Sequence, residues 1–290
     1  MDTSRAAAYI ALTKPRIIEL LLVTSVPTMV VAERGLPSVW LIIATVVGGS
    51  LAAAGANAIN MYADRDIDRL MRRTQDRPLV TGVIAPRNAL VFAIALEVIA
   101  YVWLWAFVNL LSAALAVAAC LFYVFVYTLW LKRTSTRNIV IGGAAGAVPV
   151  LIGWTAVTGT LDWAPVILFG VIFYWTPPHF WALAIRYRDD YSAAKVPMLP
   201  SVVSVRATAG RILSYTLALW ALTVLFTPVA GMGQLYLGAA IVLGGIFTWE
   251  AVQLLRAAPD RADAVALRLF SWSITYITLL FGAMAADQLL

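Results

Sequence analysis

The sequence predicts an all-α membrane protein whose helices surround a central cavity open to the cytoplasmic side. Of its 290 residues, 62% are hydrophobic and only 12% are charged, whereas a soluble domain carries roughly 25% charged residues. Apolar runs such as 89–108 and 113–131 have the length of about 20 residues that a helix needs to cross a bilayer. The lysines and arginines gather in alternate connections between these runs, as in a polytopic membrane protein.

The apolar runs place about nine spans along the chain. The first begins after Lys14-Pro15-Arg16 and is expected to be a retained transmembrane helix, because no small-residue cleavage site follows a short apolar core. The predicted spans are residues 17–33, 39–60, 89–108, 111–131, 138–157, 163–182, 212–230, 235–255 and 268–287. We expect them to form one polytopic domain over residues 1–290, since no linker or low-complexity tract interrupts them.

The positive charges predict the orientation of the bundle. If the N-terminus lies in the cytoplasm, every lysine and arginine except Arg34 falls in a cytoplasmic segment, and the C-terminus lies outside. The formal charge of +6 then reflects this bias and does not indicate a nucleic-acid partner. The long connections at about 61–88 and 183–211 share the cytoplasmic side, and long charged loops usually carry function. We therefore expect a multi-pass protein of the cell membrane whose site faces the cytoplasm.

The stretch after the second span reads NAINMYADRDIDRLMRRTQDR and is unusually charged for this chain. Asn60, Asp64 and Asp68 recur at every fourth position, so on a helix they lie on one face, each about 6 Å beyond the last. Asn57 lies one turn earlier near the same face, and Asp66 points away from it. One face thus presents two carboxylates and two carboxamides at the cytoplasmic end of the helix.

This face has the chemistry of a metal–diphosphate site. Mg²⁺ prefers oxygen ligands and usually takes one or two carboxylates together with substrate phosphates and water. The predicted metal ligands are Asn60, Asp64 and Asp68. Arginines alongside them are suited to hold phosphate oxygens, and these are Arg65, Arg69, Arg72, Arg73 and Arg77. The alternative is a set of solvated interfacial charges, paired with one another, that closes the helix.

The motif N-x-x-x-D-x-x-x-D at a cytoplasmic helix end, in a chain with nine spans, resembles the UbiA-type intramembrane prenyltransferases. In that family the motif binds the Mg²⁺–diphosphate of an isoprenoid donor. The resemblance therefore implies Mg²⁺ as cofactor. It also implies that the diphosphate is held by Asn57, Asn60, Arg72, Arg73, Arg77 and Lys132.

Further stretches resemble the haem O synthases, a branch of that superfamily. They are residues 12–16 (LTKPR), 127–133 (YTLWLKR), 175–181 (WTPPHFW) and 188–191 (RDDY), within a resemblance that covers residues 9–211. The resemblance implies transfer of a farnesyl group from farnesyl diphosphate to a vinyl group of haem B with addition of water, giving haem O and diphosphate. A downstream haem-modifying enzyme or oxidase is the partner it suggests. The implied catalytic residues are Asp64, Asp68, His179 and Lys132, and the implied haem-binding residues are His179, Arg186 and Arg188.

Two features depart from the superfamily pattern. Members that prenylate quinone precursors tend to carry a second aspartate-rich motif after the sixth span. Here His179 and Arg186 stand in place of two of those aspartates, and only Asp189-Asp190 remain. The Y-x-x-x-K signature of the superfamily is also longer by one residue, since Tyr127 and Lys132 have four residues between them.

The sequence around the single histidine predicts a broken helix. Pro177 and Pro178 lack a donor N–H, so we expect the sixth span to break just before His179. In the haem interpretation, His179 is an axial ligand or the group that handles water; the alternative is an interfacial histidine hydrogen-bonded to backbone. Arg186 and Arg188 either meet haem propionates or diphosphate, or anchor the helix at the membrane surface.

Aromatic side chains are expected to line the cavity near the reacting carbons, because aromatic faces stabilise an allylic cation. The candidates are Tyr123, Trp175, Phe180 and Trp181. Two other functions stay open: a UbiA-type prenyltransferase that acts on a quinone precursor or other aromatic acceptor, and a transporter whose aspartates bind a coupling cation. Transporters usually place such sites near the midplane on broken helices, whereas these aspartates lie at a helix end beside arginines.

Overall fold

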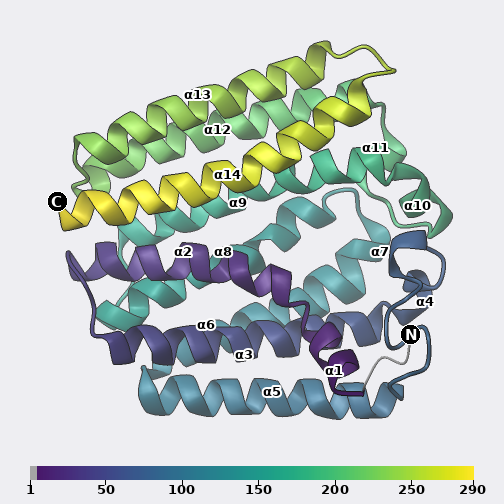
Figure 1. Ribbon diagram of the computed structural model, residues 1–290, viewed down its shortest axis with the longest axis horizontal. Helices are drawn as coiled ribbons and strands as arrows, with labels where there is room; N and C mark the ends of the chain where they lie inside the picture. The colour runs from purple at the N-terminus through teal and green to yellow at the C-terminus, as the bar shows by residue number, and fades with distance from the viewer. Residues whose placement is uncertain (1–4) are drawn as a thin grey trace.

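The computed structural model describes residues 5–290, apart from the side chains at positions 16, 17 and 19–22. The regular elements in this part of the chain are all helical, and the long helices lie side by side in one bundle (Figure 1). The prediction of an all-α membrane protein is confirmed, since eight of the described helices are long and apolar enough to cross a membrane. Another long helix, α2 (Pro15–Glu33), lies where the first span was predicted.

The remaining long helices follow the predicted spans closely. They are α3 (Val39–Ala63), α5 (Pro86–Phe107), α6 (Leu110–Leu121) with its continuations η2 (Phe122–Leu131) and α7 (Lys132–Thr134), α8 (Asn138–Thr158), α9 (Trp163–Arg186), α12 (Val205–Ala230), α13 (Gln234–Arg256) and α14 (Ala262–Leu289). The short helices are α1 (Arg5–Thr13), α4 (Arg65–Asp68), η1 (Arg72–Thr74), α10 (Arg188–Ala193) and α11 (Leu199–Val202). Helices α12 and α14 begin before their predicted apolar runs, because hydropathy does not assign their charged first turns to a span.

On the side of the bundle opposite α4, capping residues define where the helices begin and end. The side chains of Ser38, Asn109 and Asp162 each accept a backbone hydrogen bond at a helix N-terminus. Gly159 and Gly231 adopt the left-handed conformation that closes a helix C-terminus. These caps permit the short connections predicted there.

The two halves of the bundle pack differently. In the C-terminal half (Figure 1), α13 packs on both α12 and α14. Large buried side chains such as Phe226, Tyr236 and Phe247 fill the space between these helices. In the N-terminal half, α3 packs on α5 and α2 packs on α8, largely through alanine and glycine. The smaller side chains leave a cavity among α2, α3, α6, η2, α8 and α9.

The prediction that the sixth span breaks before His179 was wrong. Helix α9 runs through Pro177 and Pro178 without interruption from Trp163 to Arg186. Both prolines are buried, so packing by the neighbouring helices keeps the segment helical although two N–H groups are missing. The hydroxyl of Thr176 also donates to the carbonyl oxygen of Ile172 at 2.8 Å.

The fourth span contains a feature that the sequence did not predict. After Leu121 the chain winds as a π-helix over Phe122–Leu131, with the wider turn that an i→i−5 hydrogen bond produces. The backbone N–H of Lys132 accordingly donates to the carbonyl oxygen of Tyr127. Such segments are rare and frequently occur at functional sites.

Candidate active site

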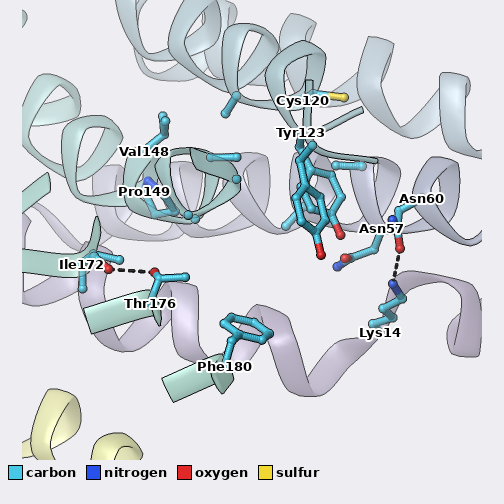
Figure 2. Close-up of a pocket in the computed structure, with 18 of the residues that line it drawn as sticks. Lys14, Asn57, Asn60, Cys120, Tyr123, Val148, Pro149, Ile172, Thr176 and Phe180 are labelled. Atoms are coloured by element: carbon cyan, nitrogen blue, oxygen red, sulfur yellow. Dashed lines mark hydrogen bonds between the residues drawn. The ribbon is translucent and has the colours of Figure 1, made fainter. Parts of the chain in front are cut away.

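A cavity of about 370 Å³ lies in the N-terminal half of the bundle, within the size range of small-molecule sites. Figure 2 shows Lys14, Asn57 and Asn60 at one end, with Val148 and Pro149 toward the other. The charged and amide side chains that line it gather at the first end and are Lys14, Asn57, Asn60, Asp68, Arg73, Arg77 and Lys132. Most of the remaining wall is apolar. The cavity therefore suits an amphiphile with a polar head and a hydrocarbon body.

The polar face predicted for Asn60, Asp64 and Asp68, called the ladder below, is present at the charged end. Helix α3 ends at Ala63, yet the N–H of Asp64 donates to Asn60 O at 2.9 Å and the N–H of Asp68 donates to Asp64 O at 2.8 Å. The i→i−4 pattern thus continues across the junction with α4. Asn60, Asp64 and Asp68 are all buried, and the two aspartates have no exposed surface.

Each buried aspartate accepts a hydrogen bond from a cation through Oδ2, and Arg133 Nη2 also lies 3.8 Å from Asp64 Oδ1. Lys132 donates to Asp64 Oδ2, and Arg77 Nη1 lies 2.6 Å from Asp68 Oδ2. The other oxygen, Oδ1, is buried in both residues and has no hydrogen-bond partner among the described residues. Buried acceptors are normally satisfied, because leaving one unpaired is costly. The two oxygens mark a place where a ligand would complete the site.

Asn60 is the centre of a hydrogen-bond network. Its Nδ2 donates to Asp64 Oδ2 at 2.9 Å and to Thr128 Oγ1 at 3.0 Å. Its Oδ1 accepts from Lys14 Nζ at 2.7 Å. With both ends of the amide engaged, Asn60 orients Asp64 in this structure and has its oxygen occupied. The predicted metal role of Asn60 requires Lys14 to release that oxygen.

Asn57, one turn earlier, does not share this network. Its Nδ2 donates to the carbonyl oxygen of Thr13 at 3.1 Å, at the junction of α1 and α2. The side chain still lines the cavity. Asn57 thus fastens the start of α2 to α3, beside the charged end.

Lys14 is a site residue that the sequence reasoning missed. It has a left-handed backbone with φ of 52°, where α1 ends and Pro15 starts α2. This turn directs the ammonium into the cavity. Burial there is the main cause that lowers the pKa of Lys14 to about 7, and the nearby cations Arg77 and Lys132 are the next. The Lys14-Pro15 pair was the available signal, because the residue before proline disfavours the helical conformation.

The π-helix brings Lys132 to the site. On an α-helix, residues five apart are separated by about 140°, so Tyr127 and Lys132 would face different directions. The wider π turn brings both onto the cavity wall. Tyr123 also lines the cavity, with its ring stacked on that of Tyr127 at a centroid distance of 5.3 Å. The π-helical turn therefore accommodates the extra residue in the Y-x-x-x-K signature.

The predicted arginines separate into two groups. Arg77 and Arg73 line the cavity, and Arg73 Nη2 donates to the Tyr191 hydroxyl at 2.8 Å. That bond links the connection after α3 to α10. Arg72, next in sequence, is exposed and does not line the cavity, so its predicted contact with diphosphate has no support in this arrangement.

Asp66 lies away from the ladder, on the exposed side of α4. Both of its oxygens accept hydrogen bonds from the Arg133 guanidinium, at 2.7 and 2.8 Å. This paired donation is the main reason that the pKa of Asp66 is lowered to about 2. Asp66 and Arg133 form a surface ion pair that holds α4 to α7, and the same guanidinium also lies 3.8 Å from Oδ1 of the buried Asp64.

His179 does not line the cavity. Its Nδ1 lies 2.7 Å from Ser273 Oγ on α14, and its ring stacks on Trp175 at a centroid distance of 4.3 Å. The cavity-facing residues of α9 follow a helical period and are Ile172, Thr176, Phe180 and Leu183, together with Trp175. His179 is turned about 100° from Phe180 and so faces α14. His179 thus lies outside the wall of this cavity, and its implied catalytic and haem-binding roles stay predictions.

Three other predicted residues also lie outside the cavity wall, and Asp64, unlike Asp68, does not line it either. Arg186 is exposed at the end of α9, and Arg188 donates to Asp263 on α14 at 2.7 Å. Trp181 is buried against Tyr215 instead of facing the cavity. For Arg186 and Trp181 the physical reason is the packing of α9 between α8, α12 and α14, which fixes its rotation, whereas Arg188 lies on α10.

The charged end has the donor set that a hard divalent cation requires. Asp64 and Asp68 supply carboxylate oxygens, and Oδ1 of each accepts no hydrogen bond, although Arg133 Nη2 lies 3.8 Å from that of Asp64. No cluster of three or more histidine, cysteine or acidic side chains suited to a metal occurs in the described part of the chain. Two carboxylates completed by substrate oxygens and water match the coordination habit of Mg²⁺, not that of a closed protein cage.

A helical membrane bundle with buried aspartates and cations at one end of an apolar cavity is the arrangement expected of an intramembrane prenyltransferase. The sequence profile of the UbiA prenyltransferase family matches residues 21–274. The chain belongs to the UbiA prenyltransferase family.

Curated relatives resemble the chain over nearly its full length. It is 55% identical to a protein named Protoheme IX farnesyltransferase from Parafrankia sp., over 99% of this chain and 92% of that one. A protein of the same name from Clavibacter michiganensis subsp. michiganensis is also 55% identical, over 99% of this chain and 94% of the relative.

Solved structures share the fold at low sequence identity. A digeranylgeranylglyceryl phosphate synthase matches with a TM-score of 0.79 and 17% identity, over 98% of each chain. A UbiA homologue from Archaeoglobus fulgidus, bound to GPP and Mg²⁺, matches with a TM-score of 0.65 and 16% identity, over 95% of this chain and 99% of that one. These likenesses establish the arrangement of the helices.

Proposed function

We propose that this protein transfers a farnesyl group from farnesyl diphosphate to a vinyl group of haem B, with addition of water, and releases haem O and diphosphate. The observation that carries the donor half is the buried pair Asp64 and Asp68, each with one oxygen that accepts no hydrogen bond, beside cations at the end of an apolar cavity. The acceptor half rests on the full-length relatives named Protoheme IX farnesyltransferase.

Mg²⁺ fits the charged end and is the cofactor that we propose. Asp64 and Asp68 would hold it through their Oδ1 atoms, which accept no hydrogen bond among the described residues. When bound, the ion supplies Lewis-acid neutralisation of the diphosphate. The Archaeoglobus fulgidus homologue bound to GPP and Mg²⁺ supports this choice, because it shows that the same fold accommodates both.

The cations of the chain stabilise the leaving diphosphate. Arg77, Lys132 and Lys14 converge on the ladder, and Arg73 lies at the same end. Charge that develops on the departing oxygens meets these fixed groups in a buried setting, where electrostatic interactions are stronger than in water. Asn60 holds Asp64 in orientation through its amide.

The apolar part of the cavity protects the allylic cation. Tyr123, Tyr127, Trp175 and Phe180 line it, and their ring faces suit a carbocation. The walls keep bulk water away until the vinyl π bond has attacked. Water then adds to the cation on the haem side and loses a proton to the released diphosphate or to solvent, which leaves a hydroxyl group. His179 acts here as a positioning residue, because its ring supports Trp175 from behind the cavity wall.

The whole chain acts as one catalytic unit in the cell membrane, with the charged end toward the cytoplasm. The support for this orientation is the concentration of lysine and arginine in the connections at that end. Farnesyl diphosphate, which is water-soluble at its head, then reaches the site from the cytoplasm. The haem product passes to a downstream haem-modifying enzyme or oxidase.

One incubation tests the proposal: purified protein with haem B, farnesyl diphosphate and Mg²⁺, followed by mass spectrometry of the haem. We expect a mass increase equal to one farnesyl group plus one hydroxyl group, because the added water loses a proton. The same incubation with EDTA in place of Mg²⁺ checks the metal. Prenylation of a hydroxybenzoate in a parallel incubation, with haem unchanged, would instead support the quinone-precursor alternative.

A further inference from the structure

The depth of the cavity raises the question of what limits the isoprenoid tail. Between Asn60 at the charged end and Gly49 at the deep end, α3 rises about 17 Å at 1.5 Å per residue. Thr45 and Val46, one turn further, also line the cavity. A tail whose diphosphate lies at Asp68 thus has a long but finite channel along α3.

The glycines on the cavity wall are of two kinds. A Cβ on Gly142 would lie 2.3 Å from Tyr127 Cδ2, and one on Gly143 would lie 3.0 Å from the Thr176 methyl group, so close packing explains both. Gly49 and Gly146 differ, because a Cβ on either would meet no atom within 4 Å. Since both line the cavity, their missing side chains leave space inside it.

These two glycines lie at different depths. Gly146 is one helical turn, about 6 Å, beyond Gly142 and its contact with Tyr127. Gly49 lies deeper, a turn short of Thr45. Both are within helices and have no positive φ, so the backbone does not require glycine at either place. Glycine even lowers helix stability relative to alanine.

We propose that Gly49 and Gly146 are specificity-determining residues, which leave room for the distal isoprene units and so set the longest tail that the cavity encloses. The inference rests on the proposed function for its donor, a prenyl diphosphate. With a cavity of only about 370 Å³, one added leucine side chain removes a substantial share of the space. Gly49 bounds the last unit of the tail, and Gly146 bounds an earlier one.

The test compares Gly49→Leu and Gly146→Leu with wild type, using geranyl and farnesyl diphosphate as donors to haem B. The measured quantity is the ratio of kcat/KM for farnesyl to that for geranyl, since this ratio cancels general losses. We expect Gly49→Leu to lower the ratio about 10- to 100-fold, the range found when a pocket excludes part of a hydrocarbon substrate. Gly146→Leu should lower kcat/KM for farnesyl at least as much and should also affect geranyl.

Gly238→Leu is the matched control. Gly238 lies within α13, its Cβ would meet no atom within 4 Å, and it does not line the cavity. The farnesyl-to-geranyl ratio of kcat/KM in Gly238→Leu should equal that of wild type. An unchanged ratio in both cavity variants, or an equal change in Gly238→Leu, overturns the proposal, because the tail then leaves the cavity by another route such as the lipid.

Two measurements test the role of these glycines separately from the proposed reaction with haem. Equilibrium binding of farnesyl and geranyl thiolodiphosphates reports the same ratio without any acceptor, so it tests the tail wall even if haem proves not to be the substrate. Gly49→Ala, which adds one methyl group into open space, should shift the ratio in the same direction by less. It keeps the test decisive if a leucine variant does not fold.

Discussion

Replacing Asp64 by asparagine keeps the shape of the side chain and removes its charge at the centre of the site. Asp64 has no exposed surface, and its partner Lys132 is 14% exposed. Breaking a buried ion pair typically costs about 3–5 kcal/mol because the remaining charge has no partner. Since Lys132 keeps some contact with solvent, we expect a loss near the lower end, about 3 kcal/mol.

The loss of activity in Asp64→Asn should exceed what its reduced stability alone would cause. Removing one preorganised charged group from a transition-state site lowers kcat about 100- to 1,000-fold. The assay is haem farnesylation followed by mass spectrometry, with thermal unfolding in detergent measured on the same samples. A double variant, Asp64→Asn with Lys132→Met, should regain most of the stability, because no buried charge is left unpaired, and stay inactive.

Asp66→Asn is the matched control, two residues away. Asp66 is 60% exposed and Arg133 is 31% exposed, and exposed ion pairs contribute about 0–1 kcal/mol. We expect near-normal activity and a small loss of stability. Wild-type turnover in Asp64→Asn, or an equal loss of activity in Asp66→Asn, would refute the assignment of the buried face to the diphosphate.

Three further outcomes are expected. The pKa of Lys14 in the folded protein is about 7, below its ordinary value of 10.5, so burial of the charged ammonium destabilises the fold fully below pH 7 and less as pH rises toward 10.5. The unfolding temperature of wild type, measured relative to that of Lys14→Met, should therefore rise between pH 7 and pH 10.5. A difference between the two proteins that does not change with pH would contradict the burial of Lys14. His179→Ala should lose haem transfer and keep farnesyl diphosphate binding in equilibrium measurements, because His179 faces Ser273 and not the cavity; lost donor binding would place it at the diphosphate. Deleting Leu129, which is exposed on η2, removes the extra residue between Tyr127 and Lys132, and activity should fall at least about 10-fold as the lysine is misplaced; full activity would show that the π-helix does not position it.

Much of the fold follows from properties that are local in sequence. Apolar length marks where a helix crosses the membrane, and the nine predicted spans coincide with long helices in the described residues. The ladder of Asn60, Asp64 and Asp68 was also predictable, because a fixed helical period determines which residues of one helix share a face. The continued hydrogen bonds across Asp64 preserve that period.

The structure decided what the period of a single helix leaves open. Periodicity sets the angles between residues of α9, but its absolute rotation depends on packing against α8, α12 and α14, and that rotation turns His179 toward Ser273. Packing likewise keeps α9 unbroken at Pro177 and Pro178. The ligand set of a site formed by several helices is therefore a tertiary property.

The sequence by itself determined that this is a helical membrane protein with paired aspartates at the end of one span, since hydropathy and helical spacing are local. Only the tertiary structure brought Lys14 and Lys132 to those aspartates, the first through a left-handed turn and the second through a π-helix. Neither backbone state has a strong signature in side-chain pattern, because each is stabilised by contacts with residues far along the chain. The same holds for Gly49 and Gly146, whose open space exists only where α3 and α8 enclose one cavity.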